Sequence, residues 1–284
     1  MPAHAAERIY SAEPGRGRWR RLAAAMRRDL AAAPALAALE LRRRLRARYR
    51  GQRLGWLWAL APALVVTLWA TLAARARVLA AGDVGAPYPL FALWGLVLWQ
   101  GLVESLTFQV EGLAAERPLL ARVALPPEAV ILSRAGEAAF GTAVKLAVAA
   151  AAFVPFGFAP PAAALAAPLA ALPLLALGTA LGLALAPFNA LQPGVGRILP
   201  ATLVVWFVLT PVLFEVPAHG LLGRIMRANP ASALLDAPRA LALGGALDSP
   251  WTWALVAALA CAALLPAWCL YRLALPFLLE RAGA

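Results

Sequence analysis

The sequence predicts an all-α, polytopic membrane protein with six transmembrane helices, an N-terminal interfacial amphipathic helix and short re-entrant outer helices. Hydrophobic residues make up 63% of the 284 residues, and charged residues only 14%. This composition is typical of helices that are apolar on every side, which lipid accommodates and water does not. The apolar residues fall in runs of about 20, the number that spans a hydrocarbon core about 30 Å thick.

The N-terminal part of the chain is strongly basic. Residues 1–33 are rich in Ala, Arg, Gly and Pro and predict a mobile cytoplasmic tail, so the six-helix domain is expected over 34–284. Between Arg42 and Arg53 the chain carries seven arginines, and over 35–50 leucines and arginines alternate at helical spacing. This pattern predicts a helix that lies in the head-group plane of the inner surface. A generic anchor for the first span has the same composition.

The transmembrane spans are predicted from the apolar runs, which lie at about 54–74, 89–110, 135–156, 164–186, 198–214 and 251–273. A polar loop is expected over 111–134, with Pro126-Pro127 opening the next helix because a first-turn proline loses no hydrogen bond. On the outer side, 215–250 is half polar, and Asn229-Pro230 is a helix-start signal. The apolar residues after that signal are too few to span, so one or two short helices are expected in the outer leaflet.

Basic residues orient these spans. Twenty of the 26 fall on the predicted inner side, five fall outside, and Lys145 lies within a span. The positive-inside tendency therefore places both termini in the cytoplasm. The net charge of +12 raises nucleic acid as a partner, but 14 of the basic residues precede Leu54, where anionic lipid head groups account for them. Membrane lipids are thus an expected partner, and nucleic acid is not.

The sequence contains no catalytic motif of the common kinds. It has no glycine-rich phosphate loop and no HExxH motif, and Cys261 and Cys269 have no histidine nearby. We therefore expect neither an enzyme nor a metal site. The charged residues within spans are Glu104, Glu137 and Lys145, and burying such a charge in lipid costs at least about 2.5 kcal/mol. We expect Glu104 and Lys145 to pair, with a transport role as the alternative, and Glu137 to contact water near the inner interface.

Tryptophans are the other unusual feature of the spans. Those near the ends of spans are expected to be interfacial anchors. Trp69 and Trp206 lie deeper, where an indole either packs against other helices or lines a pore and stacks on sugar rings. With Phe207, they are the channel-lining candidates.

Five segments of the chain together resemble one family. They are RYRGQRLGWLWALAPAL, PYPLFALWGLVLW, LLARVALPPEAVILSR, RILPATLVVWFVLTPVLF and ANPASALLDAPRALALG. In this order and spacing, over about 36–275, they resemble the permease subunit of ABC-type polysaccharide and polyol-phosphate exporters, which export O-antigen, capsular polysaccharide or teichoic acid. The matching positions are Arg48, Tyr49, Arg50, Leu54, Gly55, Trp58, Pro62, Pro87, Pro89, Phe91, Gly95, Trp99, Pro126, Ile198, Leu199, Pro200, Thr210, Pro211, Asn229, Pro230 and Arg239.

The resemblance implies a permease in the bacterial inner membrane. Two six-helix subunits would form a homodimer with a channel along the two-fold axis, above two copies of a separate soluble ATPase that binds ATP and Mg. The chain itself would bind no cofactor, and its substrate would be a lipid-linked glycan. A related ABC permease for a drug or a lipid is one alternative, and a membrane scaffold without transport is another.

The resemblance also implies roles for individual residues. Arg48, Tyr49 and Arg50 would frame the substrate entrance, because arginine binds a lipid-linked phosphate through charge-assisted hydrogen bonds. The 111–134 loop would couple to the ATPase through Glu116, Arg117 and Arg122, and the outer gate would contain Asn229, Pro230 and Arg239. The chain departs from the family between the fourth and fifth spans, where only Arg197 is charged and no acidic residue is present. The resemblance therefore gives no support for a second contact with the ATPase at this loop.

Overall fold

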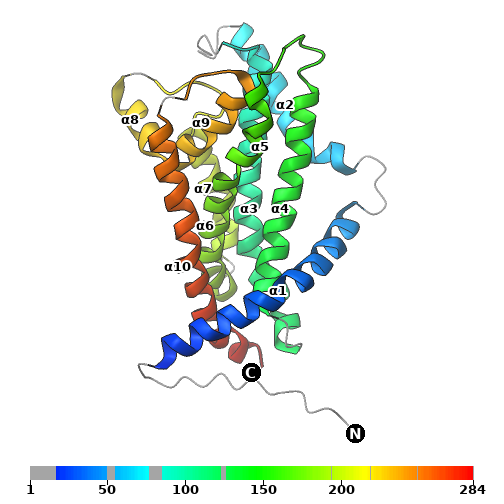
Figure 1. Cartoon of the computed structure of the whole chain (residues 1–284), viewed down its shortest axis with the longest axis vertical. Coiled ribbons are helices and arrows are strands. Elements are labelled where there is room, and N and C mark those ends of the chain that lie inside the picture. The colour runs from blue at the N-terminus through cyan, green and yellow to red at the C-terminus, as the bar shows by residue number, and fades with distance from the viewer. Residues whose placement is uncertain are drawn as a thin grey trace.

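The computed structural model describes residues 17–49, 55–76, 85–122, 126–192, 194–217, 219–247 and 249–283. Every regular element within these ranges is a helix, in agreement with the predicted all-α class. The elements are α1 (Gly17–Tyr49), α2 (Gly55–Arg75), α3 (Tyr88–Arg122), α4 (Pro127–Ala151), η1 (Ala162–Ala166), α5 (Ala167–Ala170), α6 (Leu172–Leu191), α7 (Gly194–Val208), α8 (Gly220–Ala228), α9 (Pro230–Leu243) and α10 (Pro250–Gly283). Figure 1 shows an elongated bundle with α8 and α9 at its upper end and α1 crossing its lower end.

Helix α3 lies at the centre of the bundle. In its most apolar segment 78% is buried within the chain, compared with 17% for α10, which therefore lies at the periphery. Helix α3 packs most extensively against α6 and α4. Helix α6 approaches so closely that a Cβ added at Gly178 or Gly182 would overlap atoms of α3. The largest apolar cluster includes Leu90, Trp94, Val97, Leu98, Leu102, Leu146, Leu174 and Leu234.

Helix α1 begins earlier than the sequence pattern predicts. Residues 17–33 are helical, so the prediction of a mobile tail up to residue 33 is wrong for this part, while residues 1–16 lie outside the described ranges. Met26, Ala33 and Ala37 are buried at helical spacing because this face of α1 packs against the bundle, mainly against α4. The Ala-rich composition that indicated a tail also favours a helix once such a surface is present.

The predicted loop over 111–134 is mostly helical. Helix α3 continues to Arg122, and α4 begins at Pro127, which occupies a first-turn position as predicted. Glu116 and Arg134 can remain within helices because they form ion pairs with residues of other helices. Helix α4 also ends at Ala151, before the predicted end of the third span at residue 156.

Three helices of the described part are long and apolar enough to cross a membrane. They lie within Tyr88–Glu116, Ala162–Leu191 and Pro250–Leu278, which contain the second, fourth and sixth predicted spans. The apolar parts of α2 and α7 are shorter, at Ala61–Ala73 and Gly194–Val208. The all-helical membrane class therefore stands, and the number of six spans stays a prediction.

Two short helices, α8 and α9, follow α7, in the segment where short outer helices are predicted. The Asn229 side chain caps α9 by accepting a hydrogen bond from Ala231 N at 3.1 Å, and Pro230 takes the first helical position. Helix α9 ends at Leu243, and the following Gly244 caps it with a φ of 77°, a left-handed conformation that glycine adopts without strain. The predicted helix start at Asn229-Pro230 is confirmed.

Candidate functional site

Helix α1 crosses the lower end of the bundle (Figure 1), and ion pairs attach it there. Arg44 is bonded to Glu116 of α3, and its Nε lies 3.1 Å from Glu40 Oε1 one turn earlier on α1. Arg134 Nη2 of α4 lies 3.4 Å from the same Oε1 of Glu116. The Glu116 carboxylate therefore joins α1, α3 and α4.

A second ion pair lies one turn further along α1. Arg48 Nη1 donates to Glu137 Oε1 of α4 at 3.0 Å, and the Arg48 guanidinium carbon lies 5.2 Å from the ring centroid of Phe108 on α3. Arg48, predicted at the substrate entrance, is thus engaged within the chain, and Glu137 has a cationic partner. The Tyr49 side chain and Arg50 lie outside the described residues.

A third group of charges joins α1 to α10. Arg272 is hydrogen-bonded to Asp29, and its Nε lies 2.7 Å from Glu128 Oε1 on α4. Trp268 Nε1 donates to the same Glu128 oxygen at 3.0 Å. Burial raises the pKa of Glu128, and the nearby Asp29 carboxylate raises it further, against the opposing effect of Arg272. Two carboxylates here share one guanidinium.

The face of α1 that points away from these contacts is exposed and basic. Because a helix has 3.6 residues per turn, positions 40, 44 and 48 lie on the face that meets the bundle. Arg42, Arg43 and Arg46 lie off that face and are exposed. The helix therefore uses Arg44 and Arg48 for attachment and presents Arg42, Arg43 and Arg46 on its surface, where Arg43 Nη2 also lies 2.8 Å from Glu40 Oε1.

The residues predicted to contact an ATPase are described only in part. Glu116 is used inside the chain, where it holds Arg44 and Arg134. Arg117 and Arg122 belong to the last turns of α3, but their side chains lie outside the described residues. An effect of replacing Glu116 would thus include the loss of a link between helices.

The structure brings Glu104 and Lys145 together. Lys145 Nζ lies 2.7 Å from Glu104 Oε1. The lysine side chain is 1% exposed and the glutamate side chain 21%, so the lysine is the enclosed partner. Gly141 leaves room for the carboxylate, because a Cβ added there would lie 3.2 Å from Glu104 Oε2. The charge that α4 carries into the bundle is neutralised by its neighbour α3.

The channel-lining candidates have different environments. Trp206 packs edge-to-face on Trp99, with ring centroids 5.7 Å apart, and Phe207 packs on the same indole at 5.5 Å. Trp206 Nε1 also donates to Asn229 Oδ1 at 3.1 Å. Trp69, by contrast, is 60% exposed on α2. Trp206 and Phe207 therefore pack within the chain, and Trp69 presents its ring outward.

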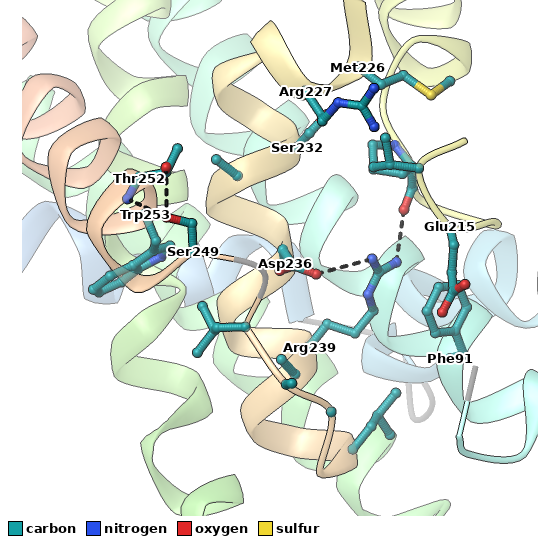
Figure 2. A pocket seen from close by; sticks show the side chains of 18 of the residues that line it. Phe91, Glu215, Met226, Arg227, Ser232, Asp236, Arg239, Ser249, Thr252 and Trp253 are labelled. Carbon is teal, nitrogen blue, oxygen red and sulfur yellow. Dashed lines mark hydrogen bonds and ion pairs between the residues drawn. The ribbon is translucent and has the colours of Figure 1, made fainter. Parts of the chain in front are cut away.

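The predicted outer gate is held together by two polar side chains. Asn229 Nδ2 donates to Leu209 O at 3.1 Å and to Thr210 Oγ1 at 2.9 Å, in addition to its capping contact. Buried Arg239 donates to Pro211 O at 2.8 Å and lies over the Phe91 ring, 4.1 Å from its centroid. Figure 2 shows this guanidinium between Asp236 and the segment that follows α7. Pro230 starts the helix that carries Arg239.

Several residues of these links were not predicted, namely Asp29, Glu40, Arg44, Glu128, Arg134 and Arg272. A signal was present at Arg272, which was counted with the residues of the inner side although it lies just within the end of the predicted span 251–273, where a charge requires a partner. Asp29 is also a lone acid between arginines and alanines. Its partner lies at the other end of the chain, which sequence spacing does not reveal.

The arrangement suits movement of helices more than chemistry on a substrate. Within the described residues, no cluster of three or more His, Cys, Asp or Glu side chains could hold a metal ion. The charged groups described above form links between helices and are not arranged as a nucleophile beside a base. They can hold α1, α3, α4 and α10 in a fixed relation and transmit a displacement from one helix to the next.

Comparison with known proteins agrees with a role in membrane transport. Residues 37–243 match the model of a family described as ABC-2 type transporter. The match runs from within α1 to the end of α9 and covers more than half of the chain. A search of curated proteins finds no match to the chain.

Proposed function

The chain belongs to the ABC-2 type transporter family, and on this premise we propose that it is the membrane-spanning subunit of an ATP-driven exporter of a lipid-linked polysaccharide. Members of this family are membrane transport components, so the chain is a permease and not a catalyst. The family also implies association with an ATPase subunit. We further propose a homodimer in the bacterial inner membrane, with both termini cytoplasmic and export toward the outer side.

The observation that carries the substrate proposal is the exposed basic face of α1. Arg42, Arg43 and Arg46 are exposed at the end of the bundle where α1 crosses it (Figure 1). A lipid-linked glycan carries a phosphate or pyrophosphate at the membrane surface, and arginine binds such groups through paired, charge-assisted hydrogen bonds. Arg44 and Arg48 pair with acidic residues of α3 and α4, whereas Arg43 pairs with Glu40 on α1 itself. The exposed Arg42, Arg43 and Arg46 are therefore better candidates for the entrance than Arg48.

The ion pairs of α1 support a mechanism of coupling. Helix α3 ends at Arg122 and α4 begins at Pro127, so their junction lies at the same end of the bundle as α1. An ATPase that displaces this junction also moves Glu116, and with it Arg44. Nucleotide binding would thereby shift α1 and open or close the entrance.

Exposed apolar side chains on α2 and α7 support the homodimer. Leu68, Trp69 and Leu72 of α2 are all more than half exposed, and so are Val204 and Val205 of α7. A second copy packed on these helices would place Trp69 near the two-fold axis. There its ring could stack on sugars that pass through the channel.

The first experiment is co-purification of the chain with its candidate ATPase, followed by measurement of ATP hydrolysis with and without lipid-linked oligosaccharide. We expect a complex with two copies of each subunit and hydrolysis that increases with substrate. A chain that purifies alone, and binds no ATPase when one is supplied, would refute the proposal that an ATPase drives the export.

The entrance is tested by replacing Arg42, Arg43 and Arg46 together with Gln. The concentration of oligosaccharide needed for half-maximal stimulation should rise about tenfold or more, because each lost charged hydrogen bond is worth about 1.5–3 kcal/mol in a favourable site. The same residues replaced with Lys should keep part of the effect, and Arg224→Gln on α8 is the control at the other end. Equal stimulation in all variants would contradict the role of α1.

A lipid exporter is the alternative, and an apolar cavity favours it. The cavity has a volume of about 480 Å³ and lies between α4, α6 and α10, with Leu132, Leu175 and Leu264 in its lining. Such a space suits an acyl chain. If phospholipid without a glycan stimulates hydrolysis as strongly as the lipid-linked oligosaccharide does, the substrate is a lipid.

A further inference from the structure

A cavity of about 660 Å³ lies at the end of the bundle opposite α1. It is enclosed by one face of α9, by the segment after α7 and by the start of α10 (Figure 2). Its size is within the range of about 300–1,000 Å³ that is usual for small-molecule sites. Neither the ion pairs of α1 nor the packing of Trp206 involves this space.

Two of the residues that line the cavity each carry a buried polar atom without a hydrogen-bond partner within the described residues. These atoms are Ser232 Oγ on α9 and Trp253 Nε1 on α10. Ser232 is only 5% exposed, so bulk water does not readily satisfy its hydroxyl. Buried polar groups in native proteins are almost always paired, and an unpaired one requires an explanation. Small movements of these side chains would let a ligand in the cavity supply the missing partners.

The charges around the cavity balance each other. The lining contains two basic residues, Arg227 and Arg239, and two acidic residues, Glu215 and Asp236. Arg239 is already bonded to Pro211 O and lies 3.7 Å from Asp236 Oδ1, as Figure 2 shows. A site for a phosphate or another anion would have an excess of positive charge. The described lining has none, so it favours an uncharged ligand.

The remaining lining is suited to hydroxyl groups. Ser232 can donate and accept, Trp253 Nε1 can donate, and the Ser249 hydroxyl already accepts from Thr252 Oγ1 at 2.9 Å. An indole beside such groups also provides an apolar surface on which a sugar ring can lie. Among uncharged ligands, a polyhydroxylated ring uses both kinds of contact.

We propose that this cavity binds a neutral sugar residue, whose hydroxyl groups pair with Ser232 Oγ and Trp253 Nε1. The identification of this sugar as part of the exported glycan rests on the proposed function. On the predicted topology the cavity faces the outer side, so it would hold a sugar that has already crossed the membrane. Such a site would retain the leading part of the glycan while the channel returns to its inward state.

The test uses the full-length protein in phosphatidylcholine nanodiscs, because many detergents carry a sugar head group that would compete. Methyl glycosides of glucose, mannose, galactose and N-acetylglucosamine are titrated, and binding is followed by saturation-transfer NMR. We expect at least one of them to bind, and Ser232→Ala and Trp253→Phe each to weaken that binding about two- to tenfold, the effect of one lost hydrogen bond.

Two matched variants control for indirect effects. Trp251→Phe changes a neighbouring tryptophan that is 86% exposed, and Ser105→Ala removes a buried hydroxyl that is bonded within α3 to Leu102 O. Neither should change binding. A third variant, Gly245→Leu, fills the cavity without touching the two polar groups, because a Cβ at Gly245 meets only Ala240 atoms at 3.7 and 3.8 Å. It should abolish binding even if Ser232→Ala fails to fold.

The outcomes separate this inference from the proposed function. If no neutral glycoside binds, or if binding is the same in Ser232→Ala, Trp253→Phe and Gly245→Leu, the site does not exist as described. Stronger binding of a sugar phosphate than of the neutral sugar would also overturn it. The complex with the ATPase is measured independently, so an exporter that lacks this site would still form that complex.

Discussion

The ion pair between Glu104 and Lys145 allows a prediction in which the two partners are unequal. Lys145 is 1% exposed and Glu104 is 21% exposed. Glu104→Gln leaves an enclosed cation without its counter-charge, and we expect a loss of about 3–5 kcal/mol in unfolding free energy, as is usual when one partner of a buried pair is removed. Lys145→Met leaves a carboxylate that retains some access to its surroundings, so we expect a smaller loss of about 1–3 kcal/mol.

The double variant tests whether these costs share one origin. Glu104→Gln with Lys145→Met leaves neither charge, so its destabilisation should be smaller than the sum of the two single changes by about 1–3 kcal/mol. The pair between Arg43 and Glu40, at 2.8 Å on the exposed side of α1, is the comparison. Its coupling should be below about 1 kcal/mol, as is typical at a surface.

The assay is equilibrium unfolding in mixed micelles with increasing SDS, followed by tryptophan fluorescence. Circular dichroism checks that each variant begins with the same helix content. A coupling energy near zero would refute the reasoning that the two charges neutralise each other. A larger loss for Lys145→Met than for Glu104→Gln would show that the glutamate, not the lysine, is the enclosed partner.

Three further predictions concern the packing and the polar contacts. Asn229→Ala should lower the unfolding free energy by about 2–4 kcal/mol, because it removes a helix cap and the partners of Trp206 Nε1 and Leu209 O. Asn229→Asp keeps the acceptor oxygens and should lower the unfolding free energy by less in the same SDS titration. Gly182→Ala should lower the Tm, since a Cβ there would overlap Leu106 O, whereas Gly194→Ala, with no atom within 4 Å, should leave the Tm unchanged or slightly higher. Burial raises the pKa of Glu128 above 4.5, so its stabilising contribution is present below that pH and is lost as the pH rises through the folded-state value. Glu128→Gln should therefore flatten the fall of Tm with rising pH, and an unchanged pH profile would contradict the assignment.

Local patterns in the sequence were sufficient to predict part of the fold. Asn229-Pro230 predicted the start of α9 because capping depends only on the first turn of a helix. The pairing of Glu104 with Lys145 could be predicted because charges are so rare in these spans that few partners exist. Both inferences needed no knowledge of how the helices are arranged.

The rest depended on contacts that spacing along the chain does not encode. Residues 17–33 are helical because Met26, Asp29 and Ala33 meet the bundle, and the same composition without that surface predicts a tail. Glu116 and Arg44 are 72 positions apart, so the sequence indicates a charged loop where the structure has a link between helices. That Ser232 and Trp253 line one cavity is likewise a consequence of how α9 and α10 pack.

The link between Asp29 and Arg272 joins residues 243 positions apart, so it can form only late in the synthesis of the protein. At about 5–20 residues per second, a ribosome needs roughly 10–50 s to reach Arg272 after it has made Asp29. Throughout that interval α1 is already synthesised, but its partner on α10 does not exist. Attachment of α1 to α10 therefore marks a chain that has been synthesised at least as far as Arg272, and a shorter, stalled chain would leave Asp29 without this partner.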